Sequence, residues 1–269
     1  MVKIAVAQIR SAESMEKNLS ISKDLVRQAS KAGAQAIFFP EASDYICSNT
    51  KRSLELCQSV EQSVFVQGLQ EQAKEYVLSI AVGIHEPSAD IKSKRVRNTL
   101  IWISDTGEVL HRYQKVHMLE MNLLDGPKIQ ESNFCEPGES ILPPFETPVG
   151  QAGAMICFDL RFPSLAQKLV SMGAEVLIYP SAFVPDTGKI HWIPLLQARA
   201  IECQAYVIAP DQVGQHNEKR SSYGHSVVID PWGRIIAQLG SEENVLLYAD
   251  IDPEQIRLAR QSLRLRKRE

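Results

Sequence analysis

The sequence has few of the features that mark a secreted, membrane-spanning or nucleic-acid-binding protein. Its five cysteines are an odd number without a CxxC pair, which excludes an all-paired disulfide framework and a zinc spacing. No run approaches the ~18 apolar residues of a membrane span, and the N-terminal VKIAVAQI is too short for a signal-peptide core. A formal net charge of −3 gives no electrostatic case for a nucleic acid or membrane partner. We expect a reduced compartment, the cytoplasm, and leave open an alternative start that adds a mitochondrial leader.

What is present is typical of a globular chain. Of its 269 residues, 44% are apolar and 23% are charged, which favours a large core over disorder. No stretch rich in proline, glycine and serine interrupts the sequence, so we expect one domain over residues 1–269. The basic cluster RLRLRKR near the C-terminus is typical of a solvated helix end.

Two segments 140 residues apart have nearly the same sequence. Residues 33–43 read GAQAIFFPEAS and residues 173–183 read GAEVLIYPSAF, with identical residues at four of the eleven positions. In both halves of the chain the predicted order is strand, helix, strand, helix, strand, hairpin. This order favours an internal duplication that forms two related sheets. A chance likeness of two helix–glycine–strand junctions would also account for it.

Apolar runs and helical spacing predict the elements of each half. In the first half they are strands at VKIAVAQI, AIFFPEA and VLSIAVGI, helices over 18–32 and 60–75, and a hairpin over 99–116. In the second half they are strands at GAMICF, VLIYPSAF and AYVIAPDQVG, helices over 163–173 and 190–204, and a hairpin over 225–240. VLLYADI then closes the sheet, and a short helix follows. Together these elements predict an α/β protein with two sheets packed face to face and helices outside, a four-layer α-β-β-α sandwich.

Three ionisable residues fall at predicted strand ends, where active groups gather in sheet proteins of this kind. Glu41 ends IFFPE, Lys115 ends VLHRYQK and Cys157 ends GAMIC. Each also has an ordinary interpretation, as a solvated glutamate, a surface lysine and an inert buried thiol. The convergence of the three residues, and the unusual CFDLRFP junction, favour a functional site. The inert interpretation stays with the remaining cysteines, which are Cys47, Cys57, Cys135 and Cys203.

Glutamate, lysine and cysteine form a coherent set for acyl transfer. A thiol with a pKa of ~8.5 needs a base or a nearby cation to react at neutral pH. Glu41 can remove the thiol proton, protonate the leaving amine and later activate water. Lys115 can hold the charge that develops on the carbonyl oxygen, together with the N–H group of Phe158. Because the set has no histidine, it is not a papain-like arrangement.

The motifs around these residues resemble a known family. FPEAS with Glu41, RYQKVH with Lys115 and ICFDLRFP with Cys157 resemble the Glu-Lys-Cys triad of the nitrilase superfamily of carbon–nitrogen hydrolases, and the resemblance covers nearly the whole chain. It implies an α-β-β-α sandwich, hydrolysis of a carbon–nitrogen bond through a thioester, no cofactor or metal, and pairing of subunits into at least a homodimer. In the Nit branch a second glutamate, about sixteen residues after the lysine, orients that lysine. The matching residue here is Glu131, in IQESN.

Further stretches are similar to the Nit amidases rather than to true nitrilases. These are GAEVLIYPSAF, HW followed by LLQARAIE, EKRSSYGHSVVIDPWG and SNFCEPG. The likeness implies a small-molecule substrate, the γ-amide of a 2-keto dicarboxylic acid, with deaminated glutathione favoured over a free keto-acid amide that releases ammonia. A catalytically silent interaction module and a nitrile hydrolase are less favoured functions that also stay open. The chain departs from the branch in VHMLEMN after the lysine and in Phe158, where tyrosine is common.

Charged residues near the predicted site are candidates for substrate binding. Arg161 can pair with a substrate carboxylate in a bidentate way, or it can tie down the Cys157 turn through a structural ion pair. Asp159 is expected to support that turn and not to act as a second base. Four further candidates can either contact the substrate or have a helix-start or solvated role. They are Thr187, His191, Lys219 and Arg220.

Overall fold

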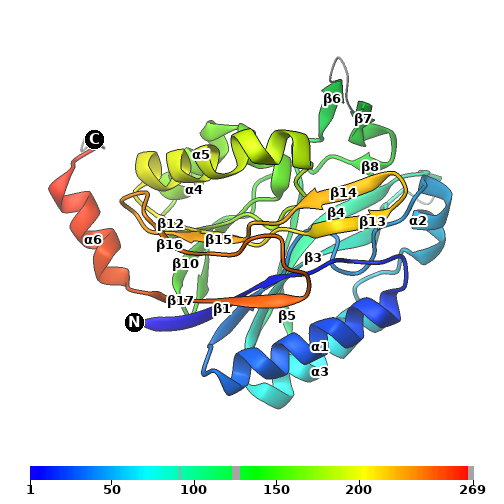
Figure 1. The fold of residues 1–269 in the computed structure, drawn as a ribbon, viewed down its shortest axis with the longest axis horizontal. Coiled ribbons are helices and arrows are strands. Elements are labelled where there is room, and N and C mark those ends of the chain that lie inside the picture. The colour runs from blue at the N-terminus through cyan, green and yellow to red at the C-terminus, as the bar shows by residue number, and fades with distance from the viewer. Residues whose placement is uncertain (91, 123–127, 266–269) are drawn as a thin grey trace.

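The computed structural model describes residues 1–90, 92–122 and 128–265. Two large sheets lie face to face, and helices cover the outer face of each (Figure 1). Helices α1 (Met15–Lys31) and α3 (Val64–Tyr76) cover one sheet, and α4 (Pro163–Ser171) and α5 (Pro185–Cys203) cover the other. The predicted four-layer α-β-β-α sandwich is confirmed. No helix in the described part of the chain is both long and apolar enough to cross a membrane.

The first sheet has the strand order β17-β1-β2-β3-β4-β5, with β8 beside β4. Its central strands β1, β2 and β3 run parallel, as the strand–helix–strand order predicts. The strands are β1 (Val2–Gln8), β2 (Ala36–Phe38), β3 (Ser79–Pro87), β4 (Val96–Ile103), β5 (Val109–Gln114), β8 (Cys135–Glu136) and β17 (Val245–Ile251).

The second sheet has the order β16-β15-β12-β11-β10-β9, and its central strands β10, β11 and β12 also run parallel. The strands are β9 (Phe145–Thr147), β10 (Gly150–Ala154), β11 (Val176–Ile178), β12 (Tyr206–Ala209), β15 (Val227–Ile229) and β16 (Ile235–Gln238). The smaller elements are α2 (Thr50–Leu56), hairpin β6–β7 (Glu120–Asn122 and Lys128–Gln130), hairpin β13–β14 (Val213–Asn217 and Arg220–Tyr223), 3₁₀ turns η1 (Glu131–Asn133) and η2 (Cys157–Arg161), and α6 (Pro253–Ser262).

Alternate residues of the strands in the first sheet point to two different apolar cores, one on each face of the sheet. On β1, Ile4 and Val6 belong to the core between the sheets, while Ala5 and Ala7 pack with residues of α1 and α3. This period-2 alternation follows from the pleat of a strand, which points successive side chains to opposite faces. Because both faces are covered, the sheet sequences read as continuous apolar runs.

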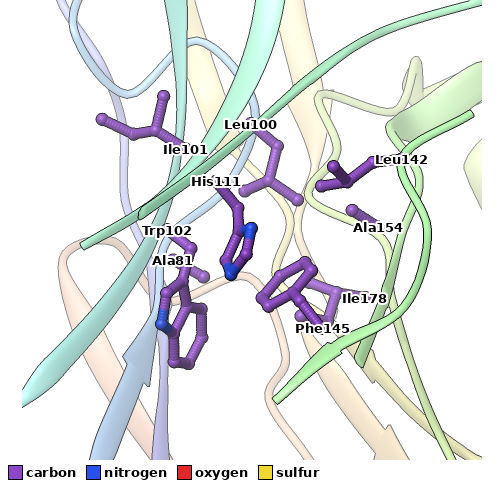
Figure 2. A pocket seen from close by; sticks show the side chains of 9 residues that line it. All are labelled: Ala81, Leu100, Ile101, Trp102, His111, Leu142, Phe145, Ala154 and Ile178. Atoms are coloured by element: carbon purple, nitrogen blue, oxygen red, sulfur yellow. The ribbon is translucent and has the colours of Figure 1, made fainter. Parts of the chain in front are cut away.

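A narrow apolar gap remains between the two sheets (Figure 2). It has no room for a water molecule. The His111 ring stacks on Phe145 there with the ring centroids 4.2 Å apart, and burial lowers the pKa of His111. No predicted site residue lines this gap, so it is a feature of sheet packing.

Two element predictions need correction. Helix α5 begins at Pro185, five residues before the predicted start at residue 190, because proline fits the first turn of a helix where its missing N–H costs nothing. Strand β17, VLLYADI, does not close the sheet of the second half. It pairs antiparallel with β1 along its whole length, from Val2 opposite Ile251 to Gln8 opposite Val245, and so joins the first sheet.

Candidate active site

The predicted site residues lie in the connections that follow the parallel strands or their neighbours. Glu41 follows β2 by three residues, Lys115 directly follows β5, and Cys157 begins the η2 turn after β10. The strands end earlier than the sequence predicts, so these residues sit on turns rather than on the strands. All three are at most 6% exposed, which is rare for a glutamate or a lysine unless it is paired.

Lys115 is held between two carboxylates. Its Nζ lies 2.9 Å from each side-chain oxygen of Glu131 and 3.0 Å from Oε1 of Glu41. Glu131, in η1, is also fixed by the N–H of Leu119 at 2.7 Å. Burial works to lower the pKa of Lys115, but the charges of Glu131 and Glu41 outweigh it and raise this pKa well above its usual value. The lysine therefore stays charged in a dry environment.

Glu41 accepts hydrogen bonds from three elements of the fold. Its Oε1 accepts from Lys115 and from Nδ2 of Asn98 at 2.5 Å, and its Oε2 accepts from the N–H of Ala182 at 2.9 Å. Burial by itself would raise the pKa of Glu41, but the charge and hydrogen bond of Lys115 and the hydrogen bond of Asn98 bring this pKa below its usual value. Glu41 is therefore an ionised carboxylate placed to receive a proton.

Asn98 is a site residue that the sequence reasoning missed. It lies on β4 and is 4% exposed, and it reaches Glu131 at 3.5 Å as well as Glu41. The available signal was an asparagine two residues before the apolar run LIWI of β4, because a buried amide requires a polar partner. Its contact with Glu41 places a neutral donor where it stabilises the charged carboxylate.

Cys157 sits on a strained backbone. Its φ of +45° lies in the left-handed region, which costs a non-glycine residue about 1–2 kcal/mol, and its N–H donates to the carbonyl of Pro180 at 3.0 Å. Burial and the negative charge of Glu41 raise the pKa of the Cys157 thiol well above its usual value, while the charge of Lys115 and the N–H of Ala182 oppose them. The resting pair is thus a thiol beside a carboxylate.

Phe158 presents its N–H at the start of η2. Within this turn the N–H of Asp159 donates to the carbonyl of Ile156 at 3.0 Å. Phe158 comes one residue earlier, before the first N–H that bonds within the turn. Such leading N–H groups at the start of a helical turn are the ones left to bind negative charge. Phe158 therefore stays a predicted oxyanion donor at the start of this turn.

Arg161 has no carboxylate partner among the described residues. Its guanidinium carbon lies 5.7 Å from the ring centroid of Phe158 and 5.2 Å from that of Phe183, and Nη1 lies 3.2 Å from Nδ1 of His191. Burial lowers the pKa of Arg161, which means that its charge lacks full compensation. The structural ion pair that the sequence allowed is not found in this part of the chain.

The remaining candidates, Thr187, Lys219 and Arg220, have no hydrogen bond to Glu41, Lys115 or Cys157 in the described part of the chain. Thr187 lies in the first turn of α5 and donates to the Val184 carbonyl at 3.3 Å, the helix-start arrangement. Lys219 and Arg220 lie on the exposed hairpin β13–β14. The five cysteines are unpaired, and burial raises the pKa of Cys47 and of Cys57 to about 12. Within residues 1–90, 92–122 and 128–265 no cluster of three His, Cys, Asp or Glu side chains is arranged to hold a metal ion.

Comparison with known proteins gives the family. The carbon-nitrogen hydrolase family matches residues 3–261. The protein called "Probable hydrolase nit2" of Schizosaccharomyces pombe is 47% identical over 254 residues, which cover 94% of this chain and 92% of the relative. The deaminated glutathione amidase of Mus musculus is 39% identical over 262 residues, which cover 97% of this chain and 80% of that enzyme.

A solved structure has the same fold. The crystal structure of Caenorhabditis elegans NitFhit matches with a TM-score of 0.92 at 34% identity, over 98% of this chain and 64% of NitFhit. The present chain therefore corresponds to only part of that protein. The chain belongs to the carbon–nitrogen hydrolase family, as an amidase of its Nit branch.

Proposed function

We propose that the chain hydrolyses the γ-amide of deaminated glutathione and releases 2-oxoglutarate and Cys-Gly. The observation that carries the proposal is the buried contact of Lys115 with both Glu41 and Glu131, beside the thiol of Cys157. Such a dry set of base, cation and nucleophile is suited to acyl transfer. The likeness to the mouse deaminated glutathione amidase supports the choice of substrate.

In the first half of the reaction Glu41 takes the thiol proton and Sγ of Cys157 attacks the amide carbon. The carbonyl electron pair moves to oxygen, where the ammonium of Lys115 and the N–H of Phe158 stabilise the negative charge. Glu41 then gives its proton to the amide nitrogen, and the carbon–nitrogen bond breaks. The products of this half are free Cys-Gly and a thioester between Cys157 and the 2-oxoglutaryl group.

In the second half Glu41 takes a proton from water, and the resulting hydroxide attacks the thioester carbon. The same oxyanion donors bind the second tetrahedral intermediate. The carbon–sulfur bond then breaks, 2-oxoglutarate leaves, and Glu41 returns its proton to the thiolate. One water is consumed for each amide bond, and the enzyme is regenerated.

Arg161 supports a substrate with a carboxylate at the acyl end. Its uncompensated guanidinium lies on the nucleophile turn, four residues from Cys157, and is flanked by the rings of Phe158 and Phe183. A guanidinium can bind a carboxylate through two parallel hydrogen bonds. We propose that Arg161 binds the keto-acid carboxylate, with His191 holding the guanidinium through Nδ1.

Hydrolysis of deaminated glutathione and of 2-oxoglutaramate should be compared directly, with Cys157→Ala as the control. Faster release of Cys-Gly, abolished in the variant, is the expected result. A preference for 2-oxoglutaramate would make the protein an omega-amidase that releases ammonia, since both substrates present the same carboxylate to Arg161. Equal rates for the wild-type chain and Cys157→Ala on both substrates would overturn the proposal.

We propose further that the chain forms at least a homodimer. Large apolar side chains are exposed on the helical layer of the second sheet, where Ile190 is 67% and Ile201 50% exposed on α5. Light scattering on the purified chain should give at least twice the monomer mass, and a monomer at micromolar concentration would contradict the proposal.

The unpaired cysteines support the cytoplasm as its compartment.

A further inference from the structure

The carboxylate of Asp159 is fully buried and accepts four hydrogen bonds. Its Oδ2 accepts from the hydroxyl of Tyr113 at 2.7 Å and from the N–H of Ile156 at 2.9 Å. Its Oδ1 accepts from the N–H of His117 at 3.0 Å and lies 2.7 Å from Nδ1 of the same histidine. Each carboxylate oxygen of Asp159 therefore has two partners within the protein.

The partners of Asp159 come from two separate segments. Tyr113 and His117 each lie two residues from Lys115, one on either side, and Ile156 directly precedes the strained Cys157. The His117 ring also stacks on Phe162 at the end of η2, with ring centroids 3.6 Å apart. One buried carboxylate thus joins the end of β5 to the turn that carries the thiol.

We infer that Asp159 is a positioning residue that holds the Lys115 segment against the Cys157 turn, so that the lysine ammonium and the Phe158 N–H converge on one substrate oxygen. The inference rests on the proposed acyl transfer. Two donors on different elements must both lie about 2.7–3.1 Å from the same oxygen. A misplacement of about 1 Å can cost a hundredfold in rate.

A second buried aspartate provides a matched control. Oδ1 of Asp230 accepts from the N–H groups of Trp232 and Arg234, both at 2.9 Å, in the turn between β15 and β16. It fixes a turn as Asp159 does, but it contacts neither the lysine segment nor the cysteine turn. If Asp159 only supported the fold, the two aspartates would respond alike to substitution.

Two variants test the inference from different sides. Asp159→Asn keeps the shape but replaces one acceptor oxygen by a donor, so two of the four donors lose their partner. Tyr113→Phe removes one hydroxyl and leaves the aspartate and its contact with Ile156 in place. The controls are Asp230→Asn and Tyr206→Phe, since the Tyr206 hydroxyl donates to the backbone of Asp252 at 3.2 Å.

The first measurement is hydrolysis of deaminated glutathione. We expect kcat to fall about a hundredfold in Asp159→Asn and about tenfold in Tyr113→Phe, the equivalent of one hydrogen bond to a charged group. KM should change less than about threefold, because Asp159 acts on the transition-state charge and not on ground-state binding. Both control variants should keep the wild-type kcat.

The second measurement needs no substrate. Alkylation of Cys157 by iodoacetamide, followed by mass spectrometry of its peptide across pH, reports how readily the thiolate forms. The charged groups that act on this thiol are Glu41, Lys115, Glu131 and Arg161. Because Lys115 favours the thiolate, a displaced lysine should shift the alkylation profile of both test variants to higher pH, and neither control should shift.

The two measurements separate the inference from the proposed function. If the wild-type chain hydrolyses no amide but the alkylation profile still shifts in Asp159→Asn and Tyr113→Phe, the proposed function fails and the positioning role stands. If the wild-type chain is active and the test variants match their controls in kcat and in alkylation, the positioning role is overturned.

Discussion

The turn that follows β2 and the turn that follows β11 begin in the same way. Each comes after a helix, a glycine with positive φ and a short parallel strand, with φ of +79° at Gly33 and +109° at Gly173. After each strand the next N–H donates to the neighbouring parallel strand, from Phe39 to Ala81 at 2.8 Å and from Tyr179 to Ile208 at 2.9 Å. The backbone scaffold of the two copies is therefore the same up to the proline.

The two turns differ in what they present after the proline. In the first, Glu41 projects into a set of donors that includes Lys115 and Asn98. In the second, Ser181 is buried and donates to the carbonyl of Tyr179, two residues earlier in its own turn, at 3.1 Å. The next residue, Ala182, donates its N–H across to Glu41. The side chain of the first turn thus meets the backbone of the second, and two similar turns supply different parts of one site.

The largest expected effect separates the two copies by their side chains. Glu41→Gln should lower kcat/KM on deaminated glutathione by about a thousandfold, because an amide cannot take the thiol proton. Ser181→Ala at the matching position should change kcat/KM less than about threefold, because its hydroxyl bonds only within its own turn. Comparable losses in both variants, with both chains folded by circular dichroism, would show that the copies share the chemistry.

A buried charge set joins Glu41 of the first turn to Lys115 and Glu131, and its disruption should weaken the fold. Glu131→Gln leaves Lys115 with Glu41 as its remaining anionic partner and should lower the free energy of unfolding by about 3 kcal/mol in a urea titration. The exposed pair of Asp24 and Arg27 is the control, and Asp24→Asn should cost less than about 0.5 kcal/mol. An unchanged urea midpoint for Glu131→Gln would contradict the dependence of Lys115 on two carboxylates.

A smaller effect is expected from the neutral donor to Glu41. Asn98→Leu should lower kcat/KM about tenfold and shift the acid limb of its pH profile to higher pH. The sign follows because Asn98 stabilises the charged form, so its loss raises the pKa of Glu41 and the carboxylate is protonated at a higher pH. Thr99→Val tests the neighbouring strand position, where the buried hydroxyl has no hydrogen-bond partner, and should leave the acid limb in place.

The smallest effect contrasts the backbones of the two turns. Ala42 has a φ of +55°, whereas its counterpart Ala182 is not among the described residues with positive φ. Ala42→Gly relieves the left-handed strain and should raise the free energy of unfolding by up to about 1 kcal/mol, while Ala182→Gly should lower it by about 0.5–1 kcal/mol. Thermal unfolding of both variants measures the two changes in stability. Changes in the same direction would contradict the strain assigned to Ala42.

Much of the fold was predictable because it depends on short-range pattern. The apolar runs of β1, β2 and β3 and the helical stripes of α1 and α5 follow from burial on both sheet faces. The partner of β17 was not predictable, since an apolar strand can pair with either sheet edge and its sequence does not record which one. The early start of α5 did have a sequence signal that the helical spacing missed, since Pro185 suits the first position of a helix.

The sequence by itself determined which chemical groups are available and in which connections they lie. Glu41, Lys115 and Cys157 were identified from residue type and local context, which decide whether a group can act as base, cation or nucleophile, and Glu131 was identified from the family resemblance. Only the tertiary structure decided how these groups meet. Asn98 reaches Glu41 from 57 positions away in the chain, and Ala182 reaches it from 141 positions away. Asp159 contacts His117, beside the lysine segment, across 42 positions. Hydrogen bonds extend only about 3 Å, so such distant partners are set by the packing of two sheets and not by any local pattern.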